Sequence, residues 1–238
     1  PHVAFFPLYE TTRYSLEIRI PWKLLELEPV SGLQLGFELF LRDDDDGGLH
    51  DHILGWNQPL ASQEKPNPSV FGTLTLQSDV QNLQEGDIGY VASSPILDGQ
   101  KERLWNQAIS VSIEQSVGSS ELTTTDLSGQ FQGIWDSSGI YLFVQVQDDS
   151  LSVDSWEMAW EDDGIGLYLD PKMNRPNTLT EEIQHYRISR NGRKILENDF
   201  LEPPEWTVPI ENILDGGPGK DGIPALLNPA MILSLIHI

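Results

Sequence analysis

The chain has 238 residues, 39 % of them hydrophobic, and carries 37 Asp and Glu against 14 Lys and Arg, for a net charge of −23. The hydrophobic share excludes a disordered chain, and the negative field makes nucleic acid and anionic membranes poor partners. Neutral ligands and hard cations such as calcium suit such a surface, although the charge could also serve solubility alone. Cysteine is absent, which excludes disulfides and Cys-ligated zinc.

The first block, residues 1–77, is expected to form three strands and one helical turn. Alternating apolar residues predict a strand over Tyr14–Ile20, and the following "PWKLLEL" is typical of a proline-started helical turn. Further strands are predicted over Leu33–Asp43 and Val70–Gln77. Residues 78–94 have little hydrophobic content and are interpreted as a linker.

The second block, residues 95–232, continues the strand pattern. A hairpin is predicted around the turn from Asp136 to Gly139, followed by a strand within Trp160–Asp170 and another in "HYRISRNGRK". Short strands joined by turn residues predict an all-β fold, an antiparallel β-sandwich of immunoglobulin or jelly-roll type with little helix.

The two ends of the chain are unusual. Regular structure is not expected from about residue 197, where Pro, Gly and Asp dominate. The closing "LSLIHI", residues 233–238, looks like translated sequencing-adaptor sequence and is interpreted as a non-native tail. The chain opens on Pro1 in place of Met, so we expect a fragment of a longer protein. No stretch is long enough to span a bilayer.

Two series of motifs occur in the chain. The second block contains, in order, Asp98-Gly99 followed by Trp105, "IWDSSGIYLFVQVQDD", Trp160-Glu161-x-Asp163 before a strand ending at Asp170, and Tyr186-Arg187. The first block contains, in order, Glu17, "IPW" at 20–22, Gly36-Phe37, "RDDDD", Trp56 and "VFGTLTL". Together they resemble the family 9 carbohydrate-binding modules, the C-terminal sugar-binding domains of many xylanases.

The order of the two series is reversed relative to that family, whose second half is matched at 10–77 and whose first half is matched at 95–193. This order indicates a tandem array in which 1–77 ends one module and 95–232 begins the next. Each half alone would expose an apolar sheet face. We therefore hypothesise that the two halves pair into one permuted sandwich; the alternative is that each completes its own repeat.

The resemblance implies a cleft in which a sugar ring is held between tryptophans. A pyranose packs its C–H face on an indole while its hydroxyls need polar partners. Trp160 is the expected platform, Glu161 and Asp163 the hydroxyl acceptors, and Trp56 the second platform, because Lys65 stands near the place where the family has a tryptophan. The alternative is that Trp160 packs at a strand edge and the acids face water.

Three other tryptophans, Trp22, Trp105 and Trp135, are expected in the core, because they lie in or beside apolar strand and turn motifs.

The resemblance also implies structural calcium. Two acidic groups could hold it, and they consist of Asp43, Asp44, Asp45 and Asp46, and of Asp148 and Asp149. The alternative is a solvated acidic loop. His50 and His52 could bind zinc or nickel, but no third ligand is indicated by the sequence.

No nucleophile elbow, P-loop, zinc-protease or dinucleotide motif occurs, so the chain is interpreted as non-catalytic. The resemblance implies a module that binds oligosaccharide or polysaccharide such as xylan or cellulose and targets an attached glycoside hydrolase, outside the cell, in the periplasm or at the cell surface. The alternatives are an extracytoplasmic sensor domain of a membrane signalling protein and a structural spacer with a decayed sugar site.

Overall fold

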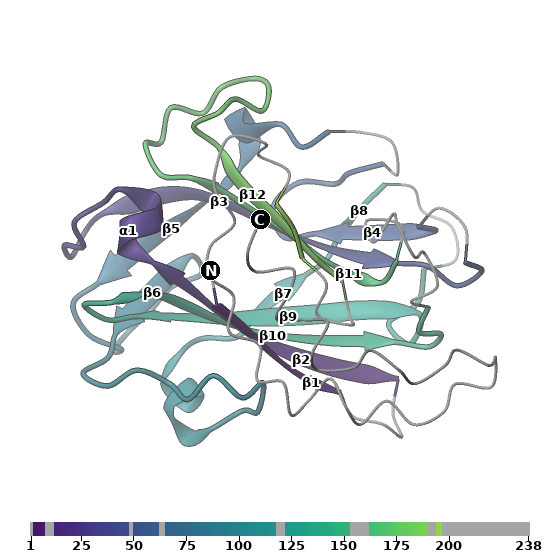
Figure 1. Ribbon diagram of the computed structural model, residues 1–238, viewed down its shortest axis with the longest axis horizontal. Helices are drawn as coiled ribbons and strands as arrows, with labels where there is room; N and C mark the ends of the chain where they lie inside the picture. The colour runs from purple at the N-terminus through teal and green to yellow at the C-terminus, as the bar shows by residue number, and fades with distance from the viewer. Residues whose placement is uncertain are drawn as a thin grey trace, which may run out of the picture. The chain divides into compact units, whose positions relative to one another are not determined.

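A computed structural model describes residues 2–7, 12–47, 50–61, 65–117, 122–152, 162–189 and 194–196 (Figure 1). Its strands are β1 His2–Pro7, β2 Arg13–Pro21, β3 Gln34–Asp43, β4 His52–Gly55, β5 Gly72–Gln77, β6 Asp87–Tyr90, β7 Val111–Ile113, β8 Gln115–Ser116, β9 Leu127–Trp135, β10 Gly139–Asp148, β11 Gly164–Asp170, β12 Gln184–Ser189 and β13 Lys194–Leu196. Helical structure is confined, in this part of the chain, to α1 Trp22–Leu25 and two 3-10 turns, Pro68–Val70 and Arg103–Gln107.

The strands form two facing layers (Figure 1). One layer has the order β1-β2-β10-β9 and the other has the order β5-β3-β11-β12-β13. The layers are joined by main-chain pairing, because β6 pairs in parallel with both β5 and β9, while β7 pairs with β9 and β8 with β4. The predicted all-β sandwich with little helix is therefore confirmed.

Central strand pairs bring together segments that lie far apart in the sequence. β2 lies antiparallel to β10, with Ile18 opposite Leu142, and β3 lies antiparallel to β11, with Leu39 opposite Leu167. Residues of the first block thus share both layers with residues of the second. The segment 78–94, expected to be a linker, contains β6, whose Ile88 is buried in the core.

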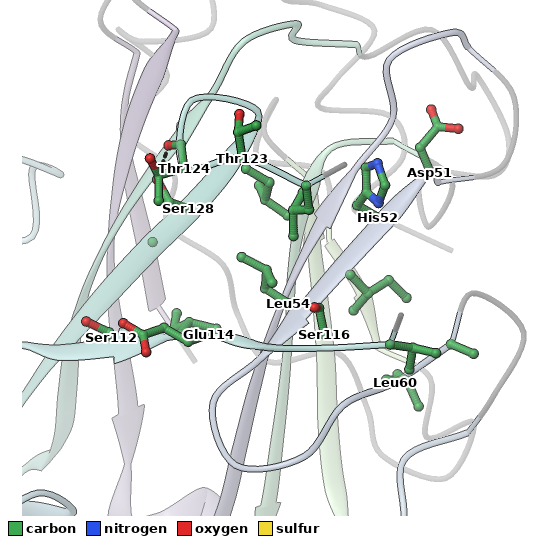
Figure 2. A pocket seen from close by; sticks show the side chains of 17 residues that line it. Asp51, His52, Leu54, Leu60, Ser112, Glu114, Ser116, Thr123, Thr124 and Ser128 are labelled. Atoms are coloured by element: carbon green, nitrogen blue, oxygen red, sulfur yellow. Dashed lines mark hydrogen bonds between the residues drawn. The ribbon is translucent and has the colours of Figure 1, made fainter. Parts of the chain in front are cut away.

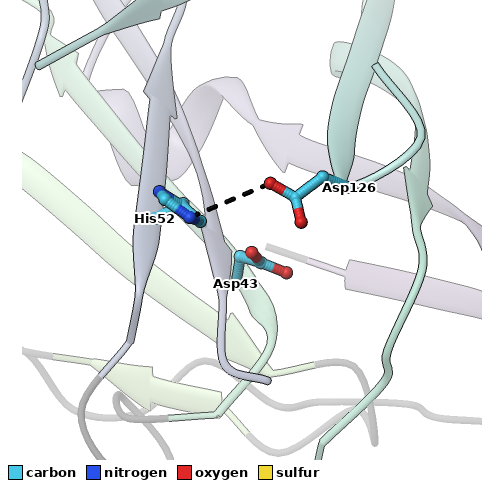
Figure 3. Close-up of side chains that lie close together, drawn as sticks. All are labelled: Asp43, His52 and Asp126. Atoms are coloured by element: carbon cyan, nitrogen blue, oxygen red, sulfur yellow. Dashed lines mark ion pairs between the residues drawn. The ribbon is translucent and has the colours of Figure 1, made fainter. Parts of the chain in front are cut away.

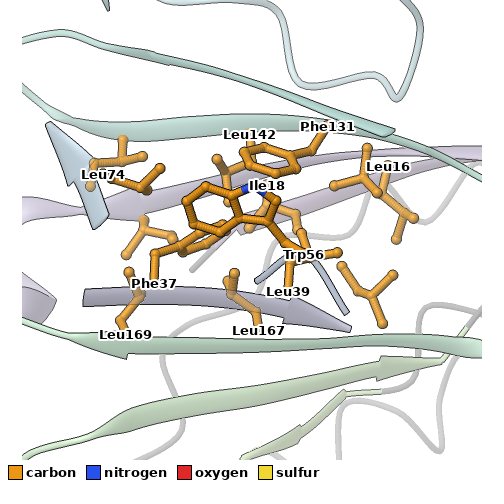
Figure 4. Packing of buried hydrophobic residues seen from close by; sticks show 14 of the residues in the cluster. Leu16, Ile18, Phe37, Leu39, Trp56, Leu74, Phe131, Leu142, Leu167 and Leu169 are labelled. Atoms are coloured by element: carbon orange, nitrogen blue, oxygen red, sulfur yellow. The ribbon is translucent and has the colours of Figure 1, made fainter. Parts of the chain in front are cut away.

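The core lies between the layers (Figure 4). Every second residue of each central strand points into it, as a strand with a period of two requires. Phe37 and Leu39 of β3 and Leu167 of β11 face Ile18 of β2 and Leu142 of β10 across this space. Trp22 and Trp135 are buried in this core, as expected, whereas Trp105 is buried in a separate cluster with Ile134, Tyr141 and Phe143.

The carboxylate of Glu17 connects β2 to the segment before β7. Its Oε2 accepts hydrogen bonds from the backbone N–H groups of Asp98 and Gly99, both at 2.8 Å, and its Oε1 accepts one from Trp105 Nε1 at 2.7 Å. Gly99 has a φ of +76°, a conformation that favours glycine. These residues belong to motifs of both blocks, and the hydrogen bonds give those motifs a structural role.

The part of the chain that the structure describes contains no helix long and apolar enough to cross a membrane. The expected irregular segment after 197 and the tail 233–238 lie outside the described residues.

Candidate functional site

Carboxylates from several strand ends converge at one end of the sandwich. We call them the acidic cluster, and its members are Asp43, Asp45, Asp126, Asp148, Asp149 and Asp163, with His52. Asp43 is the last residue of β3, Asp148 is the last residue of β10, and Asp163 directly precedes β11. Carboxylate oxygens of these three lie within 4.8 Å of one another. The two acidic groups singled out in the sequence therefore meet in space.

Asp43 is the most unusual member of the acidic cluster. Its residue surface is only 1 % exposed, and neither of its carboxylate oxygens receives a hydrogen bond from an N–H group of the described residues. Burial, followed by the charge of Asp148, raises the pKa of Asp43, and burial together with Asp163 raises the pKa of Asp148. Such a pair has to share a proton or bind a cation.

Asp163 differs from Asp43 because both of its oxygens accept hydrogen bonds from backbone N–H groups. Oδ1 accepts from Asp44 at 2.8 Å and Oδ2 accepts from Ser152 at 2.7 Å. The residue is fully buried, so its carboxylate joins two loops and does not face solvent. This position argues against the expected role of Asp163 as an acceptor for sugar hydroxyls.

The remaining members of the acidic cluster form further groups with the same spacing. Asp43, His52 and Asp126 make one such group, and His52 Nε2 lies 3.8 Å from Asp126 Oδ2 (Figure 3). Asp45, Asp126 and Asp149 make another, which is more exposed. Asp126 was missed in the sequence, because only strand pairing brings this distant position to the cluster. His52 was considered as a metal ligand only together with His50.

The other expected metal ligands lie close by. Asp44 and Asp46 form a group with Asp51, and Asp44 Oδ1 accepts a hydrogen bond from the backbone N–H of Gly47 at 2.8 Å. His50 is buried and belongs to none of the groups found among the described residues. The paired role considered for His50 and His52 is therefore not supported.

The chemistry of Asp43, Asp148 and Asp163 fits calcium. Calcium takes oxygen ligands only and tolerates irregular geometry. The three residues offer carboxylate oxygens from both layers, and Asp43 Oδ1, Asp43 Oδ2 and Asp148 Oδ2 have no hydrogen-bond partner among the described residues.

A second group of polar residues lies on the outer side of β3, β11 and β12, facing away from the core. We call it the polar face, and it consists of Glu38, Arg42, Gly164, Gly166, Tyr168, His185 and Arg187. Glu38, Tyr168 and His185 lie opposite one another across the three strands, and the Tyr168 and His185 rings are 5.4 Å apart.

Two glycines alternate on the outer side of β11. Gly164 lies opposite Arg42, and Gly166 lies between Phe40 and Arg187. The Tyr168 ring lies over Gly166, with its Cε2 atom 3.2 Å from the position that a Cβ atom would occupy there, and it packs against the Phe40 ring at 5.7 Å. The glycines appear in the sequence "DDGIGLYLD", but what they face depends on the register with β3 and β12.

Two side chains of the polar face, Glu38 and Tyr168, each have one buried oxygen atom without a hydrogen-bond partner that meets the usual distance and angle among the described residues. Glu38 is fully buried; its Oε1 accepts a hydrogen bond from the backbone N–H of Asn57 at 2.9 Å, whereas Oε2 has none. Burial raises the pKa of Glu38 to about 7. The Tyr168 hydroxyl is likewise buried without a partner. Buried polar atoms of this kind are candidates for contact with a ligand.

Of the two tryptophans predicted to stack on a sugar ring, the structure describes only Trp56. Trp56 is only 8 % exposed and packs between Phe37 and Phe131, with ring centroids 5.5 and 5.4 Å away (Figure 4). Its Nε1 donates a hydrogen bond to Glu85 Oε1 at 3.1 Å. A buried ring has no face open to a sugar, so Trp56 is a core residue and no longer a candidate platform. Trp160 and Glu161 lie outside the described residues.

A pocket of about 620 Å³ lies between β4 and β8 on one side and β7 and β9 on the other (Figure 2). Its lining combines apolar side chains, such as Leu54, Leu60 and Leu127, with hydroxyl side chains, such as Ser116 and Thr124. His52 of the acidic cluster also lines it. No Lys or Arg is found among the described residues that line it, so this lining does not favour an anion.

Comparison with known proteins gives one family and several relatives. The model of the family described as "Carbohydrate family 9 binding domain-like" matches residues 2–79 and 96–207. An endo-1,4-beta-xylanase A of Thermoanaerobacterium saccharolyticum is 24 % identical over 182 residues, which cover 76 % of this chain. An exoglucanase XynX of Acetivibrio thermocellus has the same identity over the same length, and an endo-1,4-beta-xylanase C of Paenibacillus barcinonensis is 24 % identical over 159 residues, 67 % of this chain.

The matched segments cover only 14 %, 16 % and 14 % of these three relatives, respectively. No solved structure matches the chain significantly.

Proposed function

The chain belongs to the carbohydrate family 9 binding domain-like family, and from that premise we propose that it binds oligosaccharide or polysaccharide without catalysing a reaction. The polar face supports this proposal, because it combines the aromatic ring of Tyr168 with flanking polar side chains. Sugars need both an apolar surface and hydrogen-bonding groups that fix their hydroxyls. Xylan-type and cellulose-type chains are the proposed ligands, since the relatives are named as xylanases and an exoglucanase.

The proposed cleft is the Gly164 end of the polar face, with Trp160 as its ring platform and Glu161 beside it. Trp160 precedes Gly164 by only four residues, and four residues reach at most about 14 Å even when fully extended. Tyr168 would then supply its hydroxyl group and Glu38 its Oε2 atom, since Glu38 Oε1 already accepts a hydrogen bond from Asn57.

We propose calcium as a structural cation held by Asp43, Asp148 and Asp163. Its charge would offset the repulsion between these buried carboxylates. It would also join the two layers, since Asp43 and Asp163 belong to the layer of β3 and β11 while Asp148 ends β10.

For the whole protein we propose an attached glycoside hydrolase that this module holds near polysaccharide, acting outside the cytoplasm. Tethering raises the effective concentration of the enzyme at its substrate. A ligand-sensing domain of a membrane signalling protein is the second candidate.

Tryptophan fluorescence with cello- and xylo-oligosaccharides in excess calcium tests the binding proposal. We expect a saturable change with the wild-type chain that Trp160→Ala abolishes. A flat titration of the folded wild-type chain would contradict carbohydrate binding by this module and favour the sensor or a structural spacer.

Two tyrosine variants locate the cleft. Tyr168→Phe removes a hydroxyl that has no partner among the described residues, so we expect a loss of affinity of about tenfold, as for one hydrogen bond, in a normally folded protein. Tyr141→Phe is the matched control, because its hydroxyl contacts Ser138 Oγ at 2.7 Å in the other layer. Equal affinities of the two variants would exclude the polar face.

A further inference from the structure

We propose that Asp43, His52 and Asp126 form a second cation site, which takes a borderline divalent metal such as Zn²⁺ or Co²⁺ and shares Asp43 with the proposed calcium site. Ligand atoms of all three residues lie within 4.8 Å of one another (Figure 3). This inference does not depend on carbohydrate binding.

The buried carboxylate of Asp43 is the observation that distinguishes this group from an ordinary acidic surface. The residue is nearly fully buried, and neither of its oxygens accepts a hydrogen bond from an N–H group of the described residues. Its carboxylate belongs both to the group with Asp148 and Asp163 and to the group with His52 and Asp126. A carboxylate placed between two groups of ligands in this way can bridge two cations.

The charge balance of the acidic cluster also favours a second cation. Six carboxylates belong to the groups that share Asp43 or Asp126, and they are Asp43, Asp45, Asp126, Asp148, Asp149 and Asp163. One calcium ion would offset only two of these negative charges.

The imidazole of His52 determines which metal suits this site. Calcium prefers oxygen ligands, whereas one nitrogen and two carboxylates suit zinc, cobalt and related metals. Ligand atoms around a tetrahedral zinc ion lie roughly 3.3 Å apart, and the 3.8 Å between His52 Nε2 and Asp126 Oδ2 needs only a small closure.

The site is reachable from solvent. The side chains of His52 and Asp126 are 35 % and 19 % exposed, and His52 lines the pocket of about 620 Å³ (Figure 2). Three protein ligands leave at least one coordination position open. A small neutral ligand in this pocket could therefore approach a bound metal.

The test is a titration of the calcium-saturated chain with Co²⁺, followed by visible absorption, together with calorimetry of Zn²⁺ binding. We expect one equivalent of each metal to bind while calcium stays bound, with the absorption bands of a nitrogen-ligated cobalt ion. His52→Gln and Asp126→Asn are each expected to weaken binding at least tenfold, because each removes one of three ligands.

Glu114→Gln is the matched control, because Glu114 is an exposed carboxylate that lines the same pocket but belongs to none of the groups of possible metal ligands found among the described residues. It is expected to bind Co²⁺ with wild-type affinity. The proposal would be overturned by displacement of calcium in equal amount, by wild-type affinity in His52→Gln, or by equal weakening in Glu114→Gln. Carbohydrate titrations play no part in these measurements, so failure of the proposed function leaves them interpretable.

Discussion

Glu17 and Asp43 are both buried carboxylates, yet their surroundings are opposite. Glu17 is fully buried and accepts three hydrogen bonds from N–H groups. Asp43 is equally buried but accepts none from the described residues, and its neighbours include Asp148 and Asp126. A buried carboxylate needs compensation, and the protein provides it at Glu17 through its own N–H groups.

Burial alone does not show whether the negative charge of a carboxylate is compensated by the fold. At Glu17 the fold itself supplies the hydrogen-bond donors that compensate the carboxylate, and these bonds connect β2 to the segment of Asp98 and Trp105. At Asp43 the fold brings further carboxylates into contact, which is unfavourable unless a proton or a cation is present. The first residue therefore has a structural role, whereas the second requires a shared proton or a cation such as the proposed calcium ion.

The largest expected effect comes from removing calcium, which should act through Asp43 and not through Glu17. If free calcium is a thousand times its dissociation constant, binding adds about 4 kcal/mol to the free energy of unfolding. For a chain of this size, a chelator should then lower Tm by roughly 10 °C. Differential scanning calorimetry with and without chelator measures this shift.

Asp43→Asn is the control for calcium removal. We expect the chelator to change its Tm much less, because the variant lacks the carboxylate that is shared between ligand groups. A wild-type Tm that is indifferent to the chelator would show that protons alone compensate the acidic cluster.

Glu17→Gln should have the next largest effect. The amide cannot accept all three hydrogen bonds as a carboxylate does, so we expect a loss of about 3 kcal/mol in the free energy of unfolding. Urea denaturation should give the same loss with and without calcium. A loss that depended on calcium would contradict the separation of the two regions.

The pH dependence of stability should separate the two regions further. Because the pKa values of Asp43 and Asp148 are raised in the folded state, the calcium-free native state holds more protons than the unfolded state above the ordinary carboxyl range. Its free energy of unfolding should therefore decrease, by about 2 kcal/mol, as pH rises from 5 to 8. Calcium competes with these protons, so its affinity should increase over the same range.

Urea denaturation at several pH values, with and without calcium, tests this dependence. The calcium-free Asp43→Asn variant should show a smaller slope than the wild-type chain. Burial also raises the pKa values of Glu17 and Glu38, and these contributions should remain in the variant. An equal slope in both proteins would assign the pH dependence to those residues instead.

The smallest expected effect is the change in stability when the hydroxyl group of Tyr141 or of Tyr168 is removed. Tyr141→Phe removes hydroxyl contacts to Ser138 and Asp136 and should cost about 1 kcal/mol of stability. Tyr168→Phe removes a buried hydroxyl without a partner among the described residues and should be neutral or slightly stabilising. Thermal unfolding in the absence of sugar measures both, and a larger loss for Tyr168→Phe would indicate a protein partner for its hydroxyl.

The strands were predictable where one face is buried, because alternation then appears directly in the sequence. The predicted Leu33–Asp43 strand agrees with β3, Gln34–Asp43. The segment 78–94 was misinterpreted as a linker because β6 needs few buried residues, chiefly Ile88, to form between its neighbours. Trp56 was misassigned because a motif position does not reveal whether the ring faces solvent or the core.

The acidic cluster was only half predictable. Runs of aspartate at 43–46 and 148–149 indicated calcium, but Asp126 joins them only through the pairing of distant strands, and His52 joins them by lying opposite Asp43 in the β3–β4 pair. The alternating glycines of β11 are visible in the sequence, yet what they face depends on the register with β3 and β12. Local patterns thus predict single strands, whereas sites require the register between strands.

The position of β6 has a consequence for how the protein opens. β6 joins the two layers next to Trp135, which pairs with Ile140 near the start of β10, while the acidic cluster joins them at Asp148, roughly 30 Å along the same strand. Main-chain pairing maintains the first connection without an ion, and the segment of β7 and β8 adds a second main-chain connection, which reaches Gly129 opposite Val146. Loss of the cation should therefore loosen only the end of β10 beyond Val146, so hydrogen–deuterium exchange should become fast near Asp148 while it stays slow from Ile140 to Val146.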